Sequence, residues 1–154
     1  MIEKYQMRGN RVEPMEVDDI KIKAINSCKV FKLSKERKIN FDAVFENLAL
    51  YGITLQVISD KEWLGVTEGH CDPNDFTISI PNKTYVAASK GKREALFTIF
   101  HEMGHILLGH KAILHHSQHQ PTYKEDAEWQ ADLFASTILL EIGIERQYSF
   151  DFEV

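Results

Sequence analysis

The stretch FHEMGHILL, residues 100–108, places two histidines and a glutamate inside an otherwise apolar run. It lies in a segment of about residues 92–108 whose polar positions recur at helical spacing, and Gly109 follows as a stop signal. Apolar side chains cover most of the remaining surface of this segment. We therefore predict a largely buried helix whose polar stripe must face a partner that satisfies it. The stripe consists of Glu94, Thr98, His101, Glu102 and His105.

The spacing of the two histidines suits a metal ion. His101 and His105 are one helical turn apart, so both imidazoles can reach one point and offer two nitrogen ligands to zinc. In this HExxH arrangement, Glu102 is placed to act as the general base and not as a ligand. Without a partner, these buried polar groups would cost several kcal/mol. The pattern therefore predicts a zinc site with Glu102 as the catalytic residue.

A catalytic zinc ion needs a third protein ligand and leaves a fourth position for water. The longer pattern HExxHxxGxxH is not met, because Leu108 and Lys111 occupy the places of its glycine and last histidine. Glu128 is the candidate third ligand, and Asp132, one turn further on, is placed to accept the free ring N–H of a ligating histidine. The alternative is that these acids belong to a solvated acidic face.

The order of the remaining patterns predicts an α+β fold with N-terminal helices, a small and mostly antiparallel sheet, and then the two metal-site helices. A capping box at Thr122 and Glu125 predicts the start of the last helix. We expect a single domain over residues 1–154, with an N-terminal helical part at about 16–52 and the sheet and metal-site helices at about 53–140. Helical spacing marks residues 16–33 and about 40–51, alternation marks strands at 53–57 and 76–80, and further strands are possible at 65–68 and 85–88.

Composition and charge disfavour several classes of protein. The 154 residues carry a net charge of −5, whereas nucleic-acid binding needs a clustered positive surface. The two cysteines, Cys28 and Cys71, form no CxxC pair, so neither a disulfide framework nor a thiolate zinc site is expected. The first ten residues lack the apolar core of a signal peptide, and no window approaches the length of a membrane span. We therefore expect a cytoplasmic protein without direct nucleic-acid or membrane binding.

Two motifs in this sequence resemble those of the ImmA/IrrE family of zincin-like metallopeptidases. ALFTIFHEMGHILLGH, residues 95–110, is similar to that family's habitual rFtlaHElGHllLgH. EWQADLFASTILL, residues 128–140, is similar to its E-x-x-A-[ND]-x-F-A-x-x-LL pattern. By this resemblance His101, His105 and Glu128 are the zinc ligands and Glu102 is the catalytic base.

The resemblance also implies a substrate and a location. Known members of the family are cytoplasmic proteases that cut helix-turn-helix repressors and so switch on mobile-element or stress genes. The expected partner is therefore a protein substrate, a helix-turn-helix repressor of phage or mobile-element type on a separate chain.

Three questions stay open at this point. The donor that stabilises the oxyanion is Tyr123, Tyr85 or a histidine of the loop at residues 110–119, and the sequence does not choose among them. The chain is alternatively a non-catalytic antirepressor or antitoxin-like binding protein with a structural zinc, although such a site has no need for Glu102. In another alternative, His119 replaces Glu128 in a three-histidine site like that of SprT-like proteases, which the acidic net charge disfavours.

Overall fold

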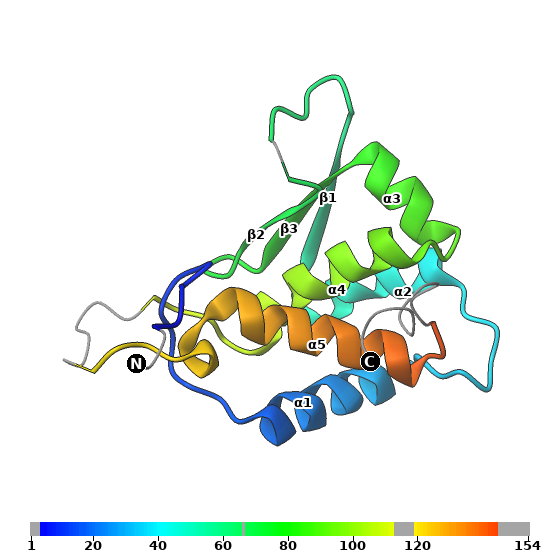
Figure 1. Cartoon of the computed structure of the whole chain (residues 1–154). Coiled ribbons are helices and arrows are strands. Elements are labelled where there is room, and N and C mark those ends of the chain that lie inside the picture. Colours follow the sequence, from blue (N-terminus) through cyan, green and yellow to red (C-terminus); the bar gives the residue numbers. More distant parts are fainter. Residues whose placement is uncertain (1–3, 66, 113–118, 145–154) are drawn as a thin grey trace, which may run out of the picture.

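The computed structural model describes residues 4–65, 67–112 and 119–144, and these form an α+β arrangement (Figure 1). The described residues contain five α-helices, two short 3-10 helices and a sheet of three strands. The helices are α1 Val17–Val30, α2 Phe41–Asn47, α3 Asn82–Ser89, α4 Arg93–Leu107 and α5 Ala127–Glu141, with 3-10 turns η1 Leu48–Tyr51 and η2 Tyr123–Glu125. The strands are β1 Thr54–Ile58, β2 His70–Asp72 and β3 Thr77–Pro81. The predicted α+β class is confirmed.

The elements are stacked so that α4 lies in the middle of the molecule. One side of α4 faces the sheet, α5 packs along its other side, and α1 packs against α5 (Figure 1). The core between these layers includes the fully buried side chains of Phe100, Met103, Phe134 and Ile138 from α4 and α5. This position explains why α4 is apolar on most of its surface, as the sequence predicts.

The sheet is mixed, which corrects the prediction of a mostly antiparallel sheet. Its order is β1-β3-β2, with β3 parallel to β1 and antiparallel to β2. A short turn joins β2 to β3 as a hairpin, whereas the chain from β1 must return along the sheet before β3 begins, so β1 and β3 run in the same direction. Alternation along a strand shows which face is buried but carries no information on this pairing.

Three other local predictions are corrected. Residues 85–88 lie in α3, because the buried side chains of Thr84 and Ala88 are one helical turn apart and Pro81 occupies the N-cap position. Residues 65, 67 and 68 are not in a strand. The capping box at Thr122 and Glu125 is present, but it caps the start of η2, and α5 begins only at Ala127.

The end of α4 agrees with the sequence. Gly109 has a φ of 68°, the left-handed conformation that glycine adopts readily after a helix. None of the helices in the described part of the chain is long and apolar enough to cross a membrane.

Candidate metal centre

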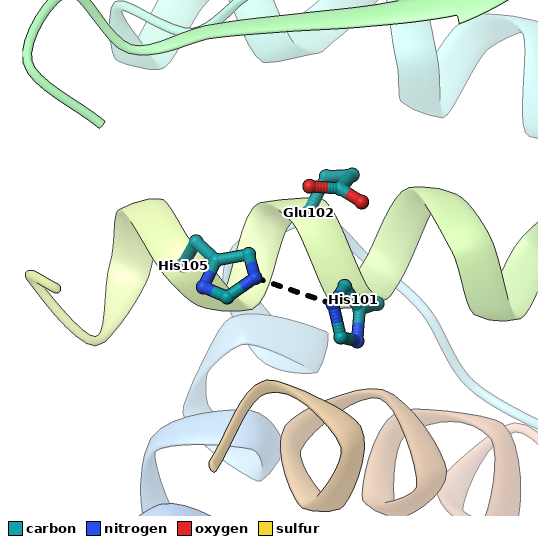
Figure 2. Close-up of side chains that lie close together, drawn as sticks. All are labelled: His101, Glu102 and His105. Carbon is teal, nitrogen blue, oxygen red and sulfur yellow. Dashed lines mark hydrogen bonds between the residues drawn. The ribbon is translucent and has the colours of Figure 1, made fainter. Parts of the chain in front are cut away.

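Helices α4 and α5 bring three potential metal-binding side chains together. The Nε2 atoms of His101 and His105 lie 3.2 Å apart on α4, joined by the dashed line in Figure 2. The carboxylate of Glu128 on α5 approaches both, with Oε1 3.1 Å from Nε2 of His101 and Oε2 2.9 Å from Nε2 of His105. The three side chains from two helices therefore form a triangle of contacts with sides of similar length, in which each oxygen of Glu128 faces one imidazole.

The size of this triangle suits a metal ion such as zinc. In a tetrahedral zinc site with bonds of about 2.0–2.1 Å, neighbouring ligand atoms are about 3.3 Å apart. Nδ1 of His101 lies 2.8 Å from Oδ1 of Asp132, and an ionised carboxylate only accepts hydrogen bonds. Nδ1 therefore carries a hydrogen, and in the neutral ring Nε2 would turn a lone pair towards Glu128. A lone pair and a carboxylate this close need a proton or a cation between them, so these residues fit a metal ion.

Glu102 is also close to the two histidines but lies on a different side of α4. The possible ligand atoms of His101, Glu102 and His105 all lie within 4.8 Å of one another. The carboxylate of Glu128 approaches the histidines more evenly, because each of its oxygens contacts one of the two Nε2 atoms. Figure 2 shows Glu102 on the side of the helix turned towards the strand above it, while the two imidazoles lie together. The carboxylate of Glu102 thus stays free for another role.

The charges of the cluster reinforce one another. Hydrogen bonds from His101 and His105 hold the pKa of Glu128 well below its usual range. Burial opposes protonation of His101, but the hydrogen bonds to Asp132 and Glu128 outweigh it and raise its pKa to about 10. For Asp132, burial is outweighed by His101 and by Arg8, whose Nη1 lies 2.9 Å away, and its pKa is lowered. The cluster therefore holds two carboxylates in their ionised form.

Burial has the largest effect on the pKa of Glu102, in contrast to that of Glu128. It raises the pKa of Glu102 against the opposing effect of the two histidines. The backbone of Gly69, just before β2, lies close by, since a Cβ there would be 2.8 Å from Cγ2 of Thr98 and 3.6 Å from Cγ of Glu102. A carboxyl group with a raised pKa in a confined place is suited to taking and releasing a proton near neutral pH.

A cavity of about 510 Å³ lies beside the cluster. Helices α4 and α5 line this cavity with the two histidines, Glu102, Glu128 and Asp132. Residues 67–71, before and within β2, line it as well. Asn10 and Val12 from the N-terminal segment also line this cavity. The candidate ligands and Glu102 therefore border the same space.

The N-terminal segment at residues 5–12 is a part of the site that sequence reasoning missed. A Cβ on Gly9 would lie 2.6 Å from Cγ of Glu128, so only glycine fits there without a shift. Arg8 pairs with Asp132, and Tyr5 donates a hydrogen bond to Asp126, the N-cap of α5. No local sequence pattern signals these contacts, because they join residues more than 100 positions apart.

Most of the candidate oxyanion donors that the structure describes do not line this cavity. The hydroxyl of Tyr85 is 3.4 Å from Oδ1 of Asp42, and Tyr123 packs edge-on against Trp129. Neither tyrosine is among the described residues that line the cavity, and the same holds for His119. Of the other loop histidines, His110 lines the cavity, whereas residues 115 and 116 lie outside the described part of the chain.

A comparison with protein families gives one match. The family model of the IrrE N-terminal-like domain, a family of metal-dependent peptidases, matches residues 67–151. This range runs from the segment before β2 through both helices of the cluster. The searches of curated proteins and of solved structures found no match.

Proposed function

The chain belongs to the IrrE N-terminal-like peptidase family, and from this premise we propose that it is a zinc-dependent endopeptidase. In this proposal His101, His105 and Glu128 hold the metal, Glu102 is the general base, and Asp132 supports His101. The observation that carries it is the triangle of contacts among these three side chains, with atom–atom separations of 3.2, 3.1 and 2.9 Å. Imidazole nitrogen and carboxylate oxygen are a donor set that zinc uses in catalytic sites.

Each residue has a separate part in peptide hydrolysis. A zinc ion bound there would supply a Lewis acid that lowers the pKa of a bound water and polarises the peptide carbonyl. Glu102 takes one proton from the attacking water while the water oxygen bonds to the carbonyl carbon. It then delivers that proton to the amide nitrogen as the C–N bond breaks. Asp132 accepts the hydrogen on Nδ1 of His101 and so keeps Nε2 directed at the metal position.

The proposed substrate is a helix-turn-helix repressor on a separate chain. The support for it is the resemblance of residues 95–110 and 128–140 to motifs of the ImmA/IrrE family, whose known members cut such repressors. We propose cytoplasmic action on the same basis, since the known members of that family are cytoplasmic.

The decisive experiment removes the base and keeps the metal. The purified wild type and Glu102→Gln are each incubated with zinc and with a helix-turn-helix repressor, the proposed substrate. We expect the wild type to cut the repressor, and Glu102→Gln to retain zinc but lose about 10²–10⁴-fold in rate, the usual contribution of a general base. Cleavage is followed by mass spectrometry and metal content by elemental analysis.

Glu94→Gln is the matched control for this test. Glu94 is on the same helix, its side chain is 80% exposed, and its ion pair is with Arg93. It should cut like the wild type. If zinc-loaded wild type binds the repressor without cutting it, the chain is a binding protein of the antirepressor kind and the peptidase proposal fails.

A second experiment tests the choice of the third ligand. Glu128→Ala removes both oxygens that contact the histidines, so we expect zinc affinity to fall by at least about 100-fold, and His119→Ala should bind zinc like the wild type. Competition with a chromophoric chelator measures both. The opposite order of affinities would assign the site to three histidines.

A further inference from the structure

Behind His105, two buried side chains form a chain of hydrogen bonds that leads away from the metal position. Nδ1 of His105 lies 2.8 Å from Nδ1 of His110, and Nε2 of His110 lies 2.7 Å from Oε1 of Gln130. Gln130 has no exposed surface, and His110 is 7% exposed. At such burial each of these polar atoms needs its hydrogen-bond partner.

Gln130 fixes the direction in which the hydrogens point. Its Nε2 amide group lies 2.9 Å from the carbonyl of Glu13 and 2.7 Å from that of Lys124, and it donates one hydrogen to each. The reversed amide would set its oxygen against two carbonyl oxygens and lose both of these hydrogen bonds, and a buried group left without a partner costs about 1–3 kcal/mol. Oε1 of Gln130 must therefore be the atom that faces His110, and it can only accept.

The orientation of Gln130 decides which ring nitrogens carry hydrogen in His110 and then in His105, the candidate metal ligand. Because Oε1 of Gln130 accepts, Nε2 of His110 carries a hydrogen, and in a neutral ring Nδ1 of His110 then holds a lone pair. Nδ1 of His105 must donate to that lone pair, which leaves the lone pair of His105 on Nε2. This is the atom that lies 2.9 Å from Glu128. In the other tautomer of His110, the hydrogen of His105 would sit on Nε2, where a metal could not bind.

The two candidate histidine ligands are supported in different ways. Behind His101 stand a carboxylate and a guanidinium, those of Asp132 and Arg8. Behind His105 stand an imidazole and an amide that end on backbone carbonyls. The hydrogen bonds from His105 through His110 to Gln130 orient the ring of His105. They do so without adding a formal negative charge to a site that already holds two carboxylates.

We propose that Gln130 and His110 are positioning residues that set the tautomer of His105 and direct its Nε2 lone pair at the metal. This inference rests on the proposed function, because it concerns the same metal site. It assigns a role to His110, which lies next to Gly109 at the end of α4, and to Gln130, which lies on α5 between Glu128 and Asp132.

The first test compares two substitutions of His110 in the full chain, with zinc affinity measured by chelator competition. His110→Leu removes the acceptor for Nδ1 of His105, and we expect zinc to bind about 10–100-fold more weakly. In His110→Asn, Oδ1 takes nearly the place of Nδ1 and still accepts, so we expect affinity within about threefold of the wild type. Equal affinity in His110→Leu and the wild type, or equal loss in both variants, would overturn the proposal.

The second test does not depend on a variant that folds. Long-range nitrogen–hydrogen NMR spectra of the wild-type chain, with and without zinc, report which ring nitrogen carries the hydrogen. We expect His110 with hydrogen on Nε2 in both states, and zinc-loaded His105 with hydrogen on Nδ1. Zinc binding with His110 in the other tautomer would overturn the positioning role of Gln130 and His110 alone. Failure of the wild type to bind zinc would instead overturn the proposed function and, with it, this positioning role.

Discussion

Asp126 is a fully buried carboxylate that joins the N-terminal segment to the start of α5. It accepts hydrogen bonds from the hydroxyl of Tyr5 and from the backbone N–H groups of Arg8, Gly9 and Glu128. Burial acts to raise its pKa, but these donors outweigh burial, and its pKa is lowered from 3.8. A single ionised side chain therefore fixes both the first turn of α5 and the segment that contacts Glu128.

This arrangement predicts how stability depends on pH. Because the pKa of Asp126 is lower in the folded than in the unfolded chain, its stabilisation is present above about pH 4 and is lost as the pH falls through the folded pKa. In Asp126→Asn an amide group replaces one accepting oxygen, and we expect a loss of about 1–3 kcal/mol at pH 7. Urea unfolding between about pH 2 and pH 7 measures both effects.

The variant should also show a smaller decrease of stability with falling pH than the wild type. Asp75→Asn, at an exposed aspartate in the turn before β3, is the matched control and should follow the wild type. Parallel stability curves for wild type and Asp126→Asn would mean that this carboxylate does not contribute to acid sensitivity.

Single residues differ in how far the sequence reveals them. The spacing of His101 and His105 places both rings on one helix face, and this local rule is enough to expect them side by side. Asp126 and Gln130 gave no such signal, since Gln130 bonds to a carbonyl 117 positions earlier in the chain. A buried polar residue inside an apolar helix shows that a partner exists, but not which one.

At the scale of elements, the close contact of α4 and α5 depends on Gly104. A Cβ there would lie 3.1 Å from Cδ1 of Phe134 and 3.3 Å from the Cα of Ala131. The second atom belongs to the backbone and can move only if the helix moves. The missing side chain therefore lets α5 come near enough for Glu128 to reach the histidines.

Gly104→Ala is accordingly expected to disturb the metal site without touching it. Overpacking at this contact should cost about 1–3 kcal/mol, and the small shift of α5 should weaken zinc binding, because the ligands come from both helices. Thermal unfolding of the metal-free protein and chelator competition measure the two effects separately. Unchanged stability together with unchanged zinc affinity would show that the helices adapt to the extra methyl group.

Long elements were predicted better than short ones. The apolar periodicity of α4 extends over four turns and leaves little choice, whereas α3 has only eight residues, and its short run at residues 85–88 reads equally as a strand. The mixed sheet shows the same limit, since the direction of β1 relative to β3 depends on the path of the chain between them. Pairing of strands is a tertiary property.

At the scale of the whole molecule, the metal position joins parts that are far apart in sequence. The candidate ligands come from α4 and α5, and the N-terminal segment contacts Glu128 and Asp132 from the outside. An ion bound there would tie these three parts together. Chain order alone predicted helices, then sheet, then helices, but it gave no sign that residues 5–12 return to the site.

Zinc is therefore expected to stabilise the whole fold. An ion that binds only the folded chain adds about 2.7 kcal/mol when its free concentration is 100 times Kd. Melting curves with zinc and with a chelator should differ by several degrees for the wild type and for Glu102→Gln, because Glu102 is not a proposed ligand. His101→Ala should lose most of this difference, since it removes one of the three donors. A zinc-dependent shift of the same size in His101→Ala would place the bound metal elsewhere in the molecule.

The zinc-dependent shift in melting temperature should also shrink as the pH is lowered. The metal-free site holds a proton on His101, whose pKa is about 10, and zinc must displace this proton to bind.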